Sequence, residues 1–338
     1  MDFALSGEQQ QFAAALHDML TAADTPAVAR GWASGDRKPG LQVWQALAEA
    51  GVTGLMVPAE HGGLGADPVD LVIACEEIGH HAVPGPVAES IAAVPALLAG
   101  LRADRQPAAP DAAGWLAQLA SGELIATLAA PPWLPLAADA DVAGLVLLAG
   151  RDRLSLAAAG PPQRSVDAAR TLAEVTATAE LAVGRDAGTL ARGLDFGVLA
   201  CAGQLLGAGR ALLELAATHA RQRVQFGQPV GSFQAVKHHL ADVAIALEFA
   251  RPLLLGAAVA LGAGRAEAPR DVSAAKVACA EAASRAARVA LQVHGAIGYT
   301  GEHDVSLYLT KVRALAPSWG TQPEHRGRIL TALTGPSR

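Results

Sequence analysis

Apolar residues recur at helical spacing through the first part of the chain. Leu41, Trp44 and Leu47 are three residues apart and would share one face of a helix. Ser6 followed by Gln9 forms a capping box, which marks the start of another helix before an apolar run. The pattern therefore predicts an N-terminal helical domain over residues 1–120.

The pattern changes in the next stretch, where apolar residues come in short runs separated by turn residues. Such runs are typical of β-strands, and about 60 residues suffice only for a compact sheet. We expect a reduced central β domain over residues 121–186. Its predicted strands are Leu124–Leu128, Val142–Leu148, Leu154–Leu156 and Ala173–Leu181.

Long helical patterns return in residues 187–338 and predict a helical bundle. The expected helices include Thr189–Gln222, Phe233–Ala263 and Asp271–His294. Several glycines interrupt the first of them, and each costs up to about 1 kcal/mol relative to alanine. Close packing against another backbone would offset that cost. These glycines are Gly197, Gly203, Gly207 and Gly209.

Composition limits the partners that this chain can have. It has 338 residues, 51% hydrophobic and 17% charged, with a net charge of −6. An acidic chain without clusters of Lys and Arg is not expected to bind nucleic acid. A surface so poor in charge indicates that another protein covers part of it. The longest uncharged run, Leu124–Ala138, has 15 residues, whereas a membrane-spanning helix needs about 20, so no membrane span is expected.

The cysteines indicate a reducing compartment. Cys75, Cys201 and Cys279 are odd in number, far apart in sequence, and match no metal-binding or redox spacing. The opening residues Met1–Phe3 lead into a polar helix and do not resemble a signal peptide. We therefore predict a cytoplasmic protein without a metal site.

Two C-terminal segments combine glycine with residues able to approach an anion. In the first, Arg223 precedes a turn with glycine and proline, and Gln234 begins the next helix. A guanidinium beside free amides at a helix start suits a pyrophosphate. The second, Gln292–Thr300, ends a long helix in small residues that allow close approach to a ligand. Taken singly, each segment is better explained as a structural element. The first would be a connection between two helices, and the second a glycine cap in which His294 is a packed histidine.

Together, in this order and spacing, the segments resemble the acyl-CoA dehydrogenase family, with its R-x-x-F-G and Q-x-x-G-G-x-G-Y/F patterns. The resemblance implies a helical domain, a small β domain and a four-helix bundle. It also implies FAD-dependent oxidation of an acyl-CoA thioester between its α and β carbons, in which a carboxylate removes a proton while the flavin accepts a hydride. The N-terminal part agrees with the family over Met1–Ser6, Trp44–Val52, Val57–Gly65 and Glu76–Gly79.

The resemblance assigns a cofactor-contacting role to both segments. In the family these positions reach across a subunit interface to the pyrophosphate and adenosine end of a neighbour's FAD. Ala296 replaces the usual second glycine, a change that a backbone contact would survive. The residues carried over are Arg223, Gln225, Phe226, Gln234, Gln292, Val293, His294, Gly295 and Ala296.

The family's catalytic glutamates have no counterpart here. Trp319 stands at the usual position, before Gly320 and Thr321, and Gly197 stands at the alternative position on the first bundle helix. Asp195 is a nearby substitute, but two residues turn it well around the helix from Gly197. We therefore expect no catalytic residue in this chain, with Asp195 or Glu60 as stand-ins if a base exists.

The flavin loop of the β domain also departs from the family. Its T-E-P-x-x-G-S-D pattern is replaced by Thr127–Trp133, and the W-I-T/S-N strand is missing. The family includes heteromeric enzymes in actinobacteria and in steroid side-chain degradation, in which one subunit carries the base and a related one completes the FAD site. This chain resembles the second kind.

We accordingly expect the non-catalytic subunit of an α2β2 acyl-CoA dehydrogenase, inactive alone and sharing FAD with a catalytic partner. Two alternatives remain open: a self-sufficient homo-oligomeric enzyme with an unplaced base, and a catalytically dead binding or scaffold protein. The sequence does not name the acyl group, which could be a steroid side chain or a fatty acid, nor the electron acceptor.

Overall fold

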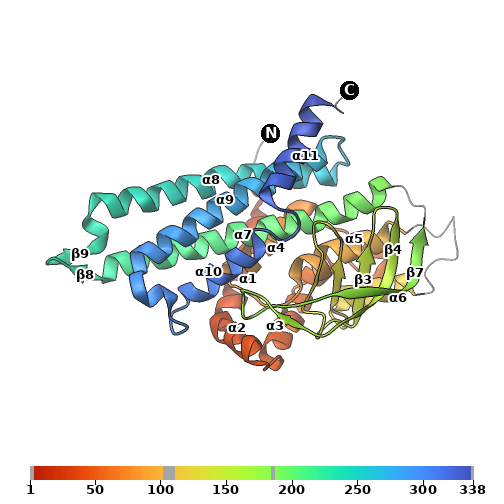
Figure 1. The fold of residues 1–338 in the computed structure, drawn as a ribbon, viewed down its shortest axis with the longest axis horizontal. Coiled ribbons are helices and arrows are strands. Elements are labelled where there is room, and N and C mark those ends of the chain that lie inside the picture. The colour runs from red at the N-terminus through yellow and green to blue at the C-terminus, as the bar shows by residue number, and fades with distance from the viewer. Residues whose placement is uncertain (1–3, 102–110, 184–186, 336–338) are drawn as a thin grey trace.

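The computed structural model describes residues 4–101, 111–183 and 187–335, so Met1–Phe3 lie outside the described residues. Helices form both ends of the chain, with a small sheet between them (Figure 1). This arrangement confirms the expected fold class. The domain boundaries at 120/121 and 186/187 stay a prediction.

The first part of the chain packs short helices around buried apolar side chains. Ser6 and Gln9 form the predicted capping box. Leu41, Trp44 and Leu47 lie on one helix as predicted, but Leu41 is 41% exposed while Trp44 and Leu47 are buried. The buried face of that helix also includes Val43, and Leu41 lies to one side of it. The helices are α1 (Gly7–Ala22), α2 (Thr25–Ser34), α3 (Lys38–Glu49), α4 (Pro68–His80), α5 (Val94–Ala99) and α6 (Ala112–Ser121), with a π-helical turn at Ala88–Ala93.

The central part forms two small sheets. One has the order β1-β3-β4-β7, in which β1 and β3 are parallel and the other pairs antiparallel. The other has the order β2-β6-β5. The strands are β1 (Ala126–Ala129), β2 (Ala137–Ala138), β3 (Leu145–Ala149), β4 (Arg153–Ala159), β5 (Gln163–Arg164), β6 (Thr171–Ala173) and β7 (Val175–Val183).

The third part is built on three long helices, α7 (Ala187–Gln222), α8 (Gln234–Gly262) and α9 (Ala268–His294), with α10 (Val305–Leu315) and α11 (Gln322–Thr334) against them. A short hairpin of β8 (Val224–Gln225) and β9 (Gln228–Pro229) joins α7 to α8. It lies at the end of the bundle opposite the sheet (Figure 1).

The glycines inside α7 let the N-terminal helices pack directly onto its backbone. A Cβ at Gly207 would lie 1.8 Å from the Glu76 carbonyl oxygen, and one at Gly203 would lie 2.9 Å from the Cys75 Cβ. Neither position has room for a side chain. The expected compensation is therefore confirmed for Gly203 and Gly207, which allow α4 and α7 to meet closely, whereas Gly197 faces the Trp319 ring.

Two bundle helices, Gly188–Gln222 and Gln234–Gly262, are long and apolar enough to cross a membrane by length and composition alone. The most apolar 18-residue stretch of the first helix is 83% buried inside the protein, so its apolar composition is that of a core helix. That of the second is only 44% buried. Part of the exposed remainder is a stripe at four-residue spacing, namely Ile245, Phe249 and Leu253.

Candidate functional site

The two positions at which the family resemblance expects a glutamate lie in contact. Trp319 is 2% exposed, and an added Cβ at Gly197 would lie 2.3 Å from its ring carbons. Trp319 has a φ of 62°, in the left-handed region that bulky residues rarely adopt. The His325 ring donates to the Trp319 carbonyl oxygen at 2.9 Å and holds this turn in place. The indole therefore fills the space above the first bundle helix.

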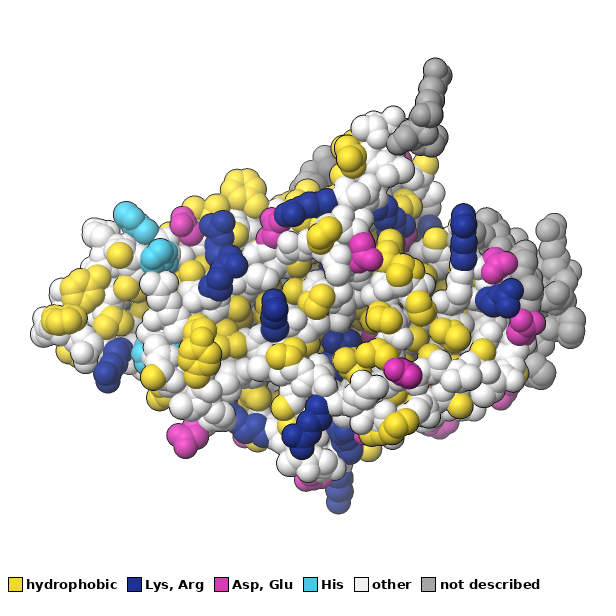
Figure 2. Space-filling model, in the orientation of Figure 1, with side chains coloured by type: hydrophobic (Ala, Val, Ile, Leu, Met, Phe, Trp, Pro, Cys, Tyr) yellow, Lys and Arg dark blue, Asp and Glu magenta, His cyan; other side chains and the backbone are white. Residues whose placement is uncertain are grey.

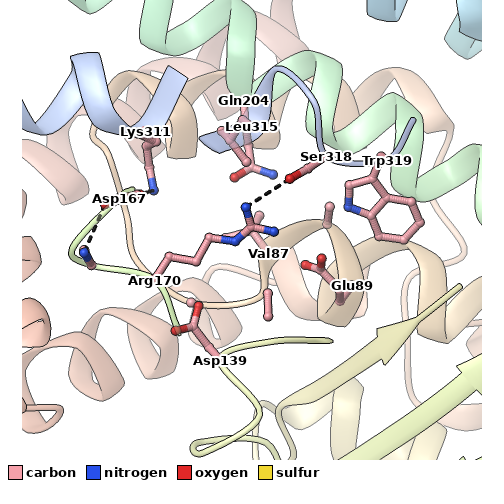
Figure 3. A pocket seen from close by; sticks show the side chains of 14 residues that line it. Val87, Glu89, Asp139, Asp167, Arg170, Gln204, Lys311, Leu315, Ser318 and Trp319 are labelled. Atoms are coloured by element: carbon pink, nitrogen blue, oxygen red, sulfur yellow. Dashed lines mark hydrogen bonds and ion pairs between the residues drawn. The ribbon is translucent and has the colours of Figure 1, made fainter. Parts of the chain in front are cut away.

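A small polar cavity lies beside Trp319, between the helical parts and the sheets (Figure 3). Its volume is about 20 Å³, which holds about one water molecule. It has no room for an acyl chain or a flavin ring. The polar and charged side chains around it include Glu89, Asp139, Arg170, Gln204, Lys311 and Ser318.

Arg170 is the main cation of this cavity. Its guanidinium donates to the Ser318 hydroxyl at 3.0 Å, linking the sheet region to the turn before Trp319. Burial raises the pKa of Glu89, while Arg170 and a hydrogen bond from Trp319 act in the opposite direction. Sequence reasoning missed Glu89. In the sequence, Glu89 stands out as the single charged residue of the otherwise uncharged run Val87–Leu98. The fold then shows that this run is largely buried.

Asp195 is held in an ion pair instead of facing a cavity. Its two carboxylate oxygens accept from the Arg328 guanidinium of α11, at 2.5 and 2.9 Å. Burial raises the pKa of Asp195, and Arg328 opposes that shift. Because both oxygens are engaged, Asp195 is a poor candidate for a base. Glu60 lies exposed in the short 3-10 turn Ala59–His61.

The segment at the flavin-loop position packs onto the Trp319 turn. The Gly320 amide donates to the Trp133 carbonyl oxygen at 3.3 Å, and the Trp133 and His325 rings lie 5.3 Å apart. The Thr127 hydroxyl is buried and donates to the Ala138 carbonyl oxygen at 2.7 Å. A cleft of about 400 Å³ opens on the outside of this segment. Its lining includes Pro131, Pro132, Trp133, Leu190, Leu194 and Arg328.

The predicted cofactor-contacting residues lie at the other end of the bundle. Phe226, at the tip of the β8–β9 hairpin, is 91% exposed, and its φ of 53° is left-handed. The Arg223 side chain is exposed and forms no ion pair within the described ranges. Gln225 and Gln234 are exposed too. We call this region, together with the end of α9, the bundle-end surface.

The structure brings the two sequence segments together at this surface. His219, one turn before Arg223, stacks on His294 with ring centroids 4.3 Å apart. His294 is buried and donates from Nδ1 to the Ala290 carbonyl oxygen at 2.8 Å, so it is the packed histidine expected from sequence. Around it Gln292, Gly295 and Ala296 are exposed, and Val293 is half-buried. Gly295 has a φ of 65° and open space where a Cβ would point.

The bundle-end surface also exposes apolar side chains. Ile297 and Tyr299 follow the end of α9 and are 46% and 77% exposed. Figure 2 shows hydrophobic side chains at the tip of the molecule where Figure 1 places the hairpin. Apolar and aromatic side chains exposed together are typical of a surface that another protein covers.

The comparisons with known proteins agree with the geometry. Family models of the acyl-CoA dehydrogenase N-terminal and C-terminal domains match residues 6–123 and 187–334. A curated relative, acyl-CoA dehydrogenase IpdE2 of Mycobacterium tuberculosis, is 32% identical over 294 residues, or 86% of each chain.

Solved structures share the fold over nearly the whole chain. One comes from the ChsE4-ChsE5 complex of Mycobacterium tuberculosis, with a TM-score of 0.82, 23% identity, and all of both chains covered. Another is a glutaryl-CoA dehydrogenase of Mycobacterium smegmatis in complex with FADH2, with a TM-score of 0.83, 18% identity, and 99% of this chain and 96% of that one covered. The chain belongs to the acyl-CoA dehydrogenase family.

Proposed function

We propose that this chain is the non-catalytic subunit of a heteromeric acyl-CoA dehydrogenase, and that it completes the FAD site of a catalytic partner. The observation that carries this proposal is the contact of Trp319 with Gly197. Neither position carries the carboxylate that a catalytic base needs, and the Trp319 indole fills the space next to Gly197. The chain itself would therefore abstract no proton from an acyl-CoA.

The cavity beside Trp319 does not fit a flavin ring. It holds about one water molecule, and Trp133 and Gly320 close the segment that would contact the ring. We therefore assign no reaction step to this interior.

The bundle-end surface fits the other end of an FAD held by a neighbour. Arg223 offers a guanidinium that has no ion-pair partner among the described residues, and a guanidinium binds a pyrophosphate strongly. Gly295 leaves open space in which a phosphate could approach the backbone. Gln225, Phe226, Gln234 and Gln292–Ala296 would surround the adenosine. FAD, when bound by the partner, would accept the hydride from the acyl β carbon in the partner's own active site.

The partner would be a related acyl-CoA dehydrogenase subunit in an α2β2 complex. The ChsE4-ChsE5 structure, by its title, is a complex of two proteins, and one of its chains shares this fold. The α8 stripe of Ile245, Phe249 and Leu253 offers an apolar face for such an interface. Acyl specificity would then lie in the partner's pocket.

Flavin content separates this proposal from its alternatives. The chain is expressed alone and together with each dehydrogenase gene that neighbours its own, and bound FAD is measured by absorbance. We expect a colourless, inactive chain alone and a yellow, active complex after co-expression. Flavin and turnover in the chain alone would contradict the proposal in favour of a self-sufficient enzyme. No flavin with any neighbour would favour a scaffold protein.

A further inference from the structure

A histidine of the N-terminal helix meets two adjacent histidines at the end of α4. His17 lies on α1, and His80 and His81 lie at the end of α4. One ring nitrogen of each lies within 4.8 Å of the others. Their ring centroids form a triangle with sides of 5.2, 4.8 and 5.0 Å. The expectation of no metal site rested on the spacing of the cysteines, which carries no information about these histidines.

The end of α4 is shaped so that two adjacent histidines reach the same point. Neighbouring residues inside a helix point about 100° apart. His81 instead caps α4 with a φ of −95°, and Ala82 follows with a φ of 50°, a left-handed conformation that alanine rarely adopts. This irregular exit turns both rings toward His17.

The separations between these side chains match those of ligands around one metal ion. The His17 Nδ1 lies 3.3 Å from the His81 Nε2 and 3.0 Å from the Glu77 Oε2. Ligands about 2.0–2.1 Å from a tetrahedral zinc ion are about 3.3–3.4 Å from one another. Glu77 approaches His17 and is not one of the three side chains whose ligand atoms all lie within 4.8 Å of one another.

Hydrogen bonding alone does not satisfy the cluster. The His17 Nδ1 carries at most one proton when the ring is neutral, yet it lies within hydrogen-bond distance of both Glu77 and His81. The His80 Nδ1 is buried and has no hydrogen-bond partner within the described residues, and the His80 side chain is 9% exposed. A cation shared by the rings would use these lone pairs.

The surroundings would hold the carboxylate in place. The Arg210 guanidinium donates to the Glu77 Oε1 at 3.0 Å and leaves Oε2 toward His17. A carboxylate hydrogen-bonded to a histidine is a usual outer partner that orients the ring toward a metal ion. The His17 side chain is 43% exposed, which gives an ion a path from solvent.

We propose that His17, His80 and His81 form a binding site for a divalent transition-metal ion of the zinc type, with the Glu77 carboxylate beside His17. The ion would join α1 to the end of α4 and stabilise the N-terminal helix on the core. It would take no part in acyl-CoA chemistry, and the site does not depend on the function proposed above.

A second cluster, His219, His294 and His303, provides an internal control. Two of its members, His219 and His294, belong to the bundle-end surface already described. The matched variants are therefore His17→Gln in the proposed site and His219→Gln in the second cluster. Both positions are partly exposed, so both proteins should fold.

The test uses the full chain, purified without a histidine tag and freed of metal with EDTA. Zn²⁺ is titrated by calorimetry, bound metal is counted by elemental analysis, and thermal unfolding is followed with and without Zn²⁺. We expect one Zn²⁺ per chain and a higher unfolding temperature in its presence. His17→Gln should weaken binding by at least about 100-fold, since changes in outer residues alone cost 10–100-fold. It should also remove the thermal shift.

His219→Gln should leave both the affinity and the thermal shift unchanged. The absence of stoichiometric binding would overturn the proposal, as would binding that His17→Gln does not weaken. Binding lost in His219→Gln but kept in His17→Gln would place the ion at the second cluster and equally reject the proposed site.

Discussion

Around Trp319, side chains from all parts of the chain pack against one another and leave room for about one water molecule. At the bundle-end surface, by contrast, Phe226 is 91% exposed and the Arg223 guanidinium forms no ion pair in the described part of the chain. The same fold thus closes one end of a cofactor site and leaves the other open. The difference indicates that a sequence pattern shared with an enzyme family does not by itself show a working site. The fold has to show whether the side chains of that pattern are buried or open to a ligand.

The largest effect is expected from restoring the family glutamate, Trp319→Glu. The change removes a buried indole and places a carboxylate near Glu89, in a cavity with room for only about one water molecule. We expect a loss of at least about 4 kcal/mol in the free energy of unfolding, and no activity in the chain alone. Urea unfolding and an electron-acceptor assay measure both. Trp319→Phe serves as the milder control. A stable, flavin-containing, active Trp319→Glu chain would mean that the interior is an intact site.

A smaller loss is expected from Asp195→Asn. The substitution leaves the Arg328 guanidinium with a neutral partner, and a charge-assisted hydrogen bond contributes about 1.5–3 kcal/mol. Stability should fall by about that amount, and Arg328→Gln should cause a similar loss. Turnover of the complex, measured with enough protein kept folded, should stay unchanged. Lost turnover with unchanged stability would identify Asp195 as the base instead.

The contact between Gly197 and Trp319 predicts coupling between the two positions. Gly197→Ala adds a methyl group that collides with the indole and should cost about 1–3 kcal/mol. In a Trp319→Val background the same change should be neutral or stabilising, because alanine favours a helix over glycine by about 0.5–1 kcal/mol. Unfolding of the four proteins forms a double-mutant cycle. Equal effects of Gly197→Ala in both backgrounds would show that the indole does not fill this space.

Features that depend on neighbours in sequence could be predicted, and those that depend on tertiary packing could not. The Ser6–Gln9 capping box and the long bundle helices follow from local pattern, and the α7 glycines correctly predicted a close backbone approach. The pairing of Asp195 with Arg328 joins residues 133 positions apart, so no local pattern reveals it.

The candidate sites show the same limit. Trp319 and Gly197 were each recognised by alignment to the family pattern, but only the fold shows that one fills the space above the other. Likewise, His17 carries no signal until α1 is placed beside the end of α4. The cofactor-contacting roles of Arg223 and its neighbours stay a prediction, because they concern a surface that a partner would complete.

The central claim is that the bundle-end surface completes a partner's FAD site. Its most direct test is to measure, at limiting FAD, the flavin content of the co-expressed complex that carries Arg223→Ala. Arg221→Ala is the matched control, since Arg221 is also exposed and donates to Thr218 on its own helix. Because an exposed arginine contributes little to folding, we expect the unfolding free energy of the isolated chain to stay within about 0.5 kcal/mol of the parent. Loss of one charge-assisted contact should weaken FAD binding by about 1.5–3 kcal/mol, or roughly 10- to 100-fold, in Arg223→Ala alone. Equal flavin occupancy in both variants and the parent complex would contradict the claim that this chain completes a partner's FAD site.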